Sequence, residues 1–125
     1  MALSTTATAV PAVADDRAGA GPRTTGVRSV RVADLIMGAL ADAGVRHVFM
    51  VSGGGAMHLD DAAGAHPGLE TVCTLHEQAA AIAAETYTKV SGRLALCLVT
   101  TGPGGTNAVT GVAGAWLDST PMIVL

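Results

Sequence analysis

Thr74-Leu75-His76-Glu77-Gln78 opens the stretch that decides the fold, and Ala79-Ala80-Ala81-Ile82-Ala83-Ala84-Glu85 continues it. The residues just before it, 69–75, form a strand-like run, and an alanine-rich helical pattern runs from Glu77 to residue 90. A second apolar strand, residues 94–99, leads into a glycine-rich turn at residues 102–107. A strand, one acid, a helix, a strand and a glycine-rich turn make a unit that can hold a ligand.

The flanking sequence repeats this alternation. Ser29 is the expected N-cap of a first helix, which stops at Gly44. A strand at residues 47–51 exits into the turn 52–55, and a short helix, 56–63, ends at Gly64. The first helix is expected to bury Val32, Leu35, Ile36, Ala39, Leu40 and Ala43, and a later helix to use the stripe Val109, Val112, Ala113, Trp116 and Leu117 before a last strand at 122–125.

Alternating strands and helices with short connections predict an α/β fold, an open parallel sheet with helices on both faces. Residues 29–125 are expected to form one domain. Residues 1–28 lack periodicity and an apolar leader segment, so we expect a disordered tail, with an organelle transit peptide as the alternative. Because the chain stops inside a strand that should be buried, we expect a domain truncated at its C-terminus.

Composition narrows the class of ligand. Half of the residues are hydrophobic and 14% are charged, which supports a packed core. A net charge of −3 offers no basic footprint for nucleic acid, and no apolar run reaches the length of a membrane span. Cys73 and Cys97 lie in apolar, strand-like runs and are expected to be buried, reduced thiols of a cytoplasmic protein. The pattern favours a small-molecule site without a metal of its own.

Three turns fall at the carboxyl ends of the predicted strands, at residues 52–55, 76–78 and 102–107. Ligands of open α/β sheets bind at that edge. Each turn alone has a plainer explanation: the triple glycine can be only a tight turn, and Thr106 can be a helix cap. Glu77 can simply complement the positive end of its helix, or it can be a proton-exchanging acid. The positive end of the helix lowers the pKa of Glu77, whereas apolar surroundings raise it, so the sequence does not decide the direction of the net pKa shift.

Four motifs occur in order along the chain: His76-Glu77-Gln78-Ala79-Ala80, Ala84-Glu85-Thr86-Tyr87, Thr101-Gly102-Pro103-Gly104-Gly105-Thr106-Asn107-Ala108-Val109-Thr110-Gly111 and Trp116-Leu117-Asp118-Ser119-Thr120-Pro121-Met122. Together they resemble the N-terminal pyrimidine-binding domain of thiamine-diphosphate enzymes, and most of all the acetolactate synthase group. The resemblance covers residues 30–125.

The resemblance implies a role for individual residues. Glu77 matches the family's catalytic glutamate, which hydrogen-bonds a ring nitrogen of the cofactor's aminopyrimidine and thereby promotes loss of the proton from the thiazolium carbon. Pro103 and Asn107 match the loop beside the pyrimidine. Gly54 and Gly55 match the loop that faces the reacting centre, and Thr100 joins the expected cofactor-binding set. Around the glycines the chain departs from the family, which has an aromatic residue and a proline before two glycines, so its substrate pocket is expected to differ.

The resemblance also implies what other chains or domains supply. Relatives bind the diphosphate and Mg²⁺ on a separate domain through a Gly-Asp-Gly motif, and no Gly-Asp pair occurs in this sequence. The flavin domain of many relatives has no counterpart here, so FAD stays open. The implied parent acts on a pyruvate-type 2-keto acid and forms a homodimer or tetramer. The alternatives are a non-catalytic fragment, or a subunit that associates with a diphosphate-binding partner chain.

Overall fold

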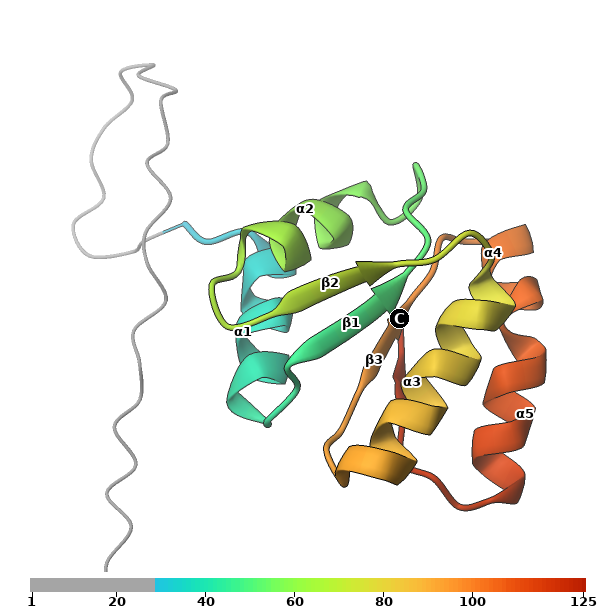
Figure 1. Cartoon of the computed structure of the whole chain (residues 1–125). Coiled ribbons are helices and arrows are strands. Elements are labelled where there is room, and N and C mark those ends of the chain that lie inside the picture. Colours follow the sequence, from blue (N-terminus) through green and yellow to red (C-terminus); the bar gives the residue numbers. More distant parts are fainter. Residues whose placement is uncertain (1–28) are drawn as a thin grey trace, which may run out of the picture.

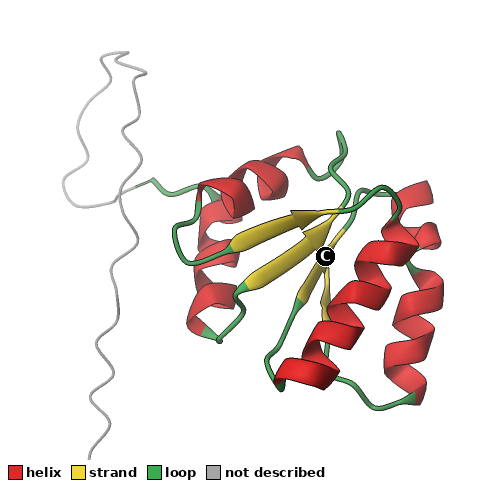
Figure 2. Ribbon diagram, in the orientation of Figure 1, coloured by secondary structure: helices red, strands yellow, loops and turns green. Residues whose placement is uncertain are grey.

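The computed structural model describes residues 29–125, so the predictions made for residues 1–28 lie outside the described residues. The described part is a three-layer sandwich in which helices cover both faces of a four-stranded sheet (Figures 1 and 2). The elements, in chain order, are α1 (Val32–Asp42), β1 (His47–Met50), α2 (Met57–Ala65), β2 (Glu70–Cys73), α3 (Glu77–Ser91), β3 (Leu96–Leu98), α4 (Pro103–Asn107), α5 (Val109–Leu117) and β4 (Ile123–Val124).

All neighbouring strands are parallel, in the order β2-β1-β3-β4. In the register, Val48 of β1 lies between Thr71 of β2 and Leu96 of β3. The pairing continues past the last strand, because the amide of Val99 donates to the carbonyl of Leu125 at 3.0 Å. The predicted α/β class, with a parallel sheet and helices on both faces, is confirmed.

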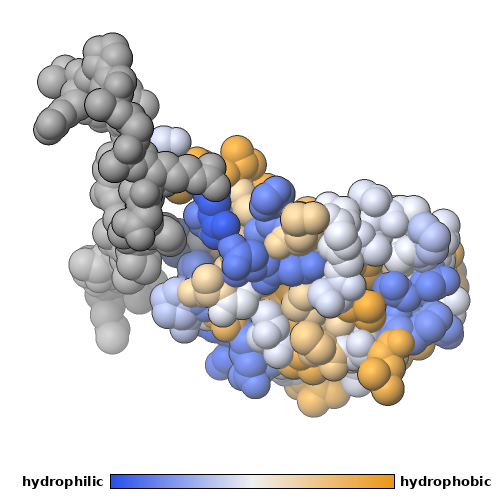
Figure 3. Space-filling view, turned by 90° about the horizontal axis from the view of Figure 1, so that it is seen from above, coloured by the Kyte–Doolittle hydropathy of each residue, from blue (hydrophilic) through white to orange (hydrophobic). Residues whose placement is uncertain are grey.

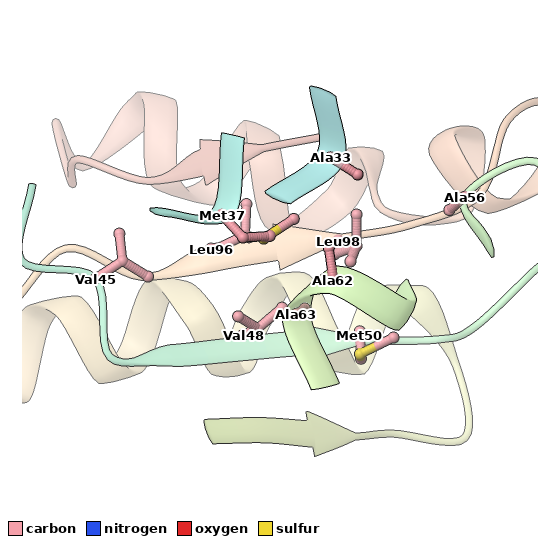
Figure 4. Close-up of a cluster of buried hydrophobic side chains, with 10 residues drawn as sticks. All are labelled: Ala33, Met37, Val45, Val48, Met50, Ala56, Ala62, Ala63, Leu96 and Leu98. Atoms are coloured by element: carbon pink, nitrogen blue, oxygen red, sulfur yellow. The ribbon is translucent and has the colours of Figure 1, made fainter. Parts of the chain in front are cut away.

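One face of the sheet packs on α1 and α2. Alternate strand residues point to this side, as the two-residue period of a strand requires. The cluster is aliphatic and nearly solvent-free, with Met37 of α1 fully buried at its centre (Figure 4). Its other members are Ala33, Val45, Val48, Met50, Ala56, Ala62, Ala63, Leu96 and Leu98.

The opposite face packs on α3, which runs beside α5 (Figure 1). Phe49 of β1 and Cys97 of β3 point to this side, against Ala80 and Ala84 of α3. Alanine is the small side chain that lets a helix approach a sheet closely, and Ala80, Ala81 and Ala84 are fully buried. Burial raises the pKa of the Cys97 thiol to about 11, so this cysteine stays protonated at neutral pH.

Helices α3 and α5 meet through small residues. A Cβ on Gly111 would lie 2.5 Å from the Cβ of Ala81 and 2.8 Å from the backbone nitrogen of Ile82. Further along, Lys89 of α3 bonds both Glu85, at 2.7 Å, and Asp118 beyond the end of α5. The contact fixes α3, and with it the position of Glu77 at its first turn.

This packing overturns the expected stripe of the later helix. Val109, Trp116 and Leu117 are exposed, and so are Val112 and Ala113. The buried residues of α5 are Gly111 and Ala115. The large apolar residues of α5 do recur at helical spacing. The side of α5 that carries Gly111 nevertheless packs against α3, because small residues allow the two helices to approach more closely.

Other local predictions also fail. In α1 the fully buried side is Ala33, Met37, Gly38 and Ala41. Of the expected stripe, Ile36 and Leu40 are half-buried and pack against the core, whereas Val32 and Leu35 are 70% and 55% exposed. Arg31, not Ser29, is the N-cap, and α2 continues through Gly64 to Ala65. Cys73 is exposed, because β2 is an edge strand and its last residue has no cover. No helix within residues 29–125 is long and apolar enough to cross a membrane.

The backbone contact at Gly111 generates a stability prediction. Gly111→Ala should lower the free energy of unfolding by about 1–3 kcal/mol, because overpacking a tight contact forces the two helices apart. Gly64→Ala is the matched control: a Cβ there meets nothing within 4 Å, so this variant should be as stable as the wild type or slightly more stable. Urea unfolding followed by circular dichroism measures both. Equal stability of Gly111→Ala and the wild type would contradict the packing described.

Candidate functional site

The carboxyl ends of the strands bring three chain segments to one end of the molecule. In Figure 1 the arrowheads of β1 and β2 point toward the end at which α3 begins and α4 lies. The first segment is the glycine turn after β1, residues 53–55. The second is the start of α3 at Glu77, and the third is Thr100 together with α4, after β3. Parallel pairing of β1, β2 and β3 is what places these segments together.

Thr100 joins the first and third segments. Its Oγ1 accepts a hydrogen bond from the amide of Gly55 at 3.1 Å. A Cβ on Gly53 would lie 2.5 Å from the Cβ of Thr100, and one on Gly104 would lie 2.9 Å from its Cγ2. Any side chain at these glycines would collide with Thr100. Glycine is therefore required here for close approach.

The helix that carries Glu77 is capped by its neighbour. The Nδ1 atom of His76 accepts a hydrogen bond from the amide of Gln78 at 3.1 Å, which satisfies one of the free amides of the first turn of α3. Because Nδ1 accepts, the neutral imidazole carries its proton on Nε2. Sequence reasoning missed this capping role of His76.

Glu77 is the first residue of α3, and its side chain is held by Asn107. The Nδ2 atom of Asn107 donates to Oε2 of Glu77 at 3.0 Å. The Asn107 hydrogen bond, with the helix's own first amide, lowers the pKa of Glu77 below its ordinary value. The sign that sequence left open is thus settled toward the ionised form. Such a carboxylate favours the folded state above the ordinary glutamate pKa, and this contribution is lost as pH falls through the lowered value.

The second carboxylate oxygen of Glu77, Oε1, lies next to the backbone of Gly104. A Cβ on Gly104 would lie 3.5 Å from Oε1, an ordinary contact distance, so Oε1 lies beside the backbone of this buried glycine. An ionised carboxylate in this position can accept a hydrogen bond from an N–H group, such as that of a protonated ring nitrogen, and can exchange a proton with it. Within residues 29–125 no group of three or more His, Cys, Asp or Glu side chains could hold a metal ion.

The remaining predicted residues line this end with fewer contacts. Pro103 is the first residue of α4 and is exposed. Gly54 is exposed, and a Cβ there would meet nothing within 4 Å. Thr106 does not cap a helix: it lies inside α4, and its hydroxyl donates to the carbonyl of Pro103 at 2.9 Å. The N-cap of α4 is Gly102, at a φ of 70°.

Sequence reasoning missed Asp60. This residue of α2 accepts the amide of Gly53 through Oδ2 at 3.1 Å and so anchors the glycine turn to α2. A signal was present, because an acid follows the glycines within two helical turns and has no basic residue beside it in sequence. Gly104 was also missed as the close-approach residue next to Glu77.

The family described as thiamine pyrophosphate enzyme, N-terminal TPP binding domain, matches residues 30–125. The chain belongs to this family. The matched residues include all three segments of the site. The family resemblance inferred from the four sequence motifs is confirmed.

Acetolactate synthases are among its relatives. The acetolactate synthase large subunit of Buchnera aphidicola subsp. Acyrthosiphon pisum is 41% identical over 93 residues, which are 74% of this chain and 16% of that protein. The isozyme 3 large subunit of Escherichia coli K12 is also 41% identical over 93 residues. A probable chloroplastic acetolactate synthase 2 of Oryza sativa subsp. japonica is 40% identical over 124 residues, 99% of this chain and 18% of that protein. The chain therefore spans less than a fifth of the length of these relatives.

The cap on α3 generates a second stability prediction. His76→Ala should lower the free energy of unfolding by about 1 kcal/mol, because the amide of Gln78 loses its acceptor. His76→Asn should retain wild-type stability, because asparagine is among the best N-cap residues. Thermal unfolding of the two variants side by side tests this. If alanine and asparagine shift the midpoint equally, the imidazole is not acting as a cap.

Proposed function

We propose that this chain is the N-terminal, pyrimidine-binding part of an acetolactate-synthase-like enzyme that decarboxylates a pyruvate-type 2-keto acid and forms a carbon–carbon bond. The observation that carries the proposal is the Glu77 carboxylate at the start of α3, which Asn107 holds through one oxygen and whose other oxygen lies beside Gly104. The 40–41% identity to acetolactate synthases supports the choice of reaction.

The residues at this end fit the pyrimidine half of thiamine diphosphate. The ring nitrogen of an aminopyrimidine is a weak base, and a carboxylate is the partner that can share its proton. Oε1 lies beside Gly104, where a Cβ would be 3.5 Å away, so the neighbour of this oxygen on α4 is backbone and not a side chain. We propose that Glu77 binds the ring nitrogen, and that Gly54, Gly55, Thr100, Pro103 and Asn107 line the cofactor.

Each residue has a limited task in this proposal. When bound, thiamine diphosphate supplies the carbon nucleophile that attacks the keto group. Glu77 orients the pyrimidine and holds a proton at its ring nitrogen. Thr100 keeps the glycine turn and α4 at fixed distance from each other, and the turn at Gly54 is open on the side where a substrate would enter. Mg²⁺ and the diphosphate require residues of another domain, and FAD is left open.

We propose further that a second protein chain completes the site, in a homodimer or tetramer of the full-length protein. The exposed apolar side of α5, which begins two residues after Asn107, supports this: Trp116 and Leu117 are 84% and 81% exposed. Leu75, two residues before Glu77, is fully exposed. Hydrophobic residues reach the surface in several places in the view from above (Figure 3). Large exposed apolar patches mark interaction surfaces. A cytoplasmic location is consistent with the free thiols of Cys73 and Cys97.

Substitution of Glu77 tests the function. In the complete enzyme, Glu77→Gln should lower kcat for acetolactate formation from pyruvate at least ~100-fold, because the amide cannot take up the proton. Glu70→Gln is the matched control, since Glu70 begins β2 at the opposite end of the sheet and should keep wild-type turnover. Wild-type turnover of Glu77→Gln would reject the assignment.

The same exposed face favours one alternative, a non-catalytic subunit that docks on a partner chain carrying the Gly-Asp-Gly motif. Mixing this chain with such a partner, followed by size measurement and a product assay, separates the two. The alternative would be favoured if the two chains form a complex and product formation with thiamine diphosphate is the same with and without the Glu77→Gln substitution.

A further inference from the structure

Asn107 is the side-chain link between α4 and α3. It is the last residue of α4, and its bond to Glu77 spans 30 positions of sequence. Within the described residues it forms the only side-chain hydrogen bond between these two helices. An ionised carboxylate only accepts hydrogen bonds, so the amide nitrogen, not the amide oxygen, faces Glu77. The orientation of the Asn107 amide is thereby fixed.

The bond also fixes the Glu77 carboxylate. With Oε2 bonded to Asn107, Oε1 is the oxygen that lies beside Gly104. Gly104 belongs to the same short helix as Asn107, and its position is set by the close contact with Thr100. One short helix therefore supplies both the donor that holds one oxygen and the glycine backbone next to the other.

We propose that Asn107 is a positioning residue, whose amide holds Oε2 of Glu77 and thereby directs Oε1 toward a ligand beside α4. This rests on the proposed function for the identity of that ligand, a flat nitrogen base. It differs from a cofactor-lining role, because Asn107 acts through Glu77. Its loss would release the carboxylate to rotate away from Gly104.

Few other groups compete with Asn107 for control of Glu77. His76, the adjacent N-cap, is the nearby titratable group on the same element. Helix α4, which packs against Glu77, contains no charged residue, and neither does the strand-end segment at Thr100 and Thr101. Replacing Asn107 should therefore change the pKa of Glu77 more than it changes the pKa of any other carboxyl group in the chain.

The chain is suited to a direct test, because it contains three glutamates, Glu70, Glu77 and Glu85. Labelling glutamate with ¹³C gives a titration curve for each carboxyl in the 125-residue chain by NMR, with no cofactor present. Asn107→Ala should raise the pKa of Glu77 toward the ordinary glutamate value and leave Glu70 and Glu85 unchanged. Asn107→Asp should raise it further, because a like charge disfavours the ionised form.

Thr106→Ala is the control. The hydroxyl of Thr106 bonds only within α4, so its removal should not change the pKa of Glu77. An unchanged Glu77 pKa in Asn107→Ala would overturn the proposal, as would equal shifts in all three glutamates. If Asn107→Ala fails to fold, Asn107→Leu, which is of similar size but has no donor, decides: a raised Glu77 pKa supports the proposal, and an unaltered one rejects it. Because no turnover is measured, failure here is distinct from failure of the proposed function.

Discussion

The side chain of Thr100 is the constraint on which the candidate site depends. It occupies the space that a Cβ would need on Gly53, Gly55 and Gly104, with would-be contacts of 2.5, 2.9 and 2.9 Å. Two loops from different parts of the chain can meet there only because all three positions are glycine. Thr100 itself is fixed because it follows β3, which pairs with β1 directly before the glycine turn. The Asn107–Glu77 bond is the next consequence, since α4 follows Thr100.

A second close approach, between α3 and α5, sets the outer surface. Gly111 lets the backbones meet, so the large apolar residues of α5 are turned outward. Leaving Trp116 and Leu117 in water is unfavourable for an isolated domain, since each buried large side chain contributes roughly 1.5–3 kcal/mol. The same packing thus supports α3, which carries Glu77, and leaves apolar residues exposed along α5, with Trp116 and Leu117 at the end of the helix away from the site.

The sequence predicted where helices and strands lie better than it predicted which side of each helix or strand is buried. The strands and helices follow from the spacing of apolar residues and from the glycines that end each segment. The acid at the start of α3 was recognised from its position directly after a strand. The buried side of α5 was predicted wrongly, because periodicity favours Val109 and Trp116 whereas packing against Ala81 favours Gly111. Cys73 was predicted to be buried because its run is apolar, but strand order makes β2 an edge. The pKa direction of Glu77 could not be predicted, because its main cause, Asn107, lies 30 residues away.

In the proposed function, the Glu77 carboxylate activates thiamine diphosphate. The most direct measurement is the rate at which the C2 hydrogen of bound cofactor exchanges for deuterium in the complete enzyme, compared between wild type and the E77Q variant. We expect rapid exchange in the wild type and a rate near that of free cofactor in E77Q, with the cofactor still bound. Equally rapid exchange in both proteins would contradict it.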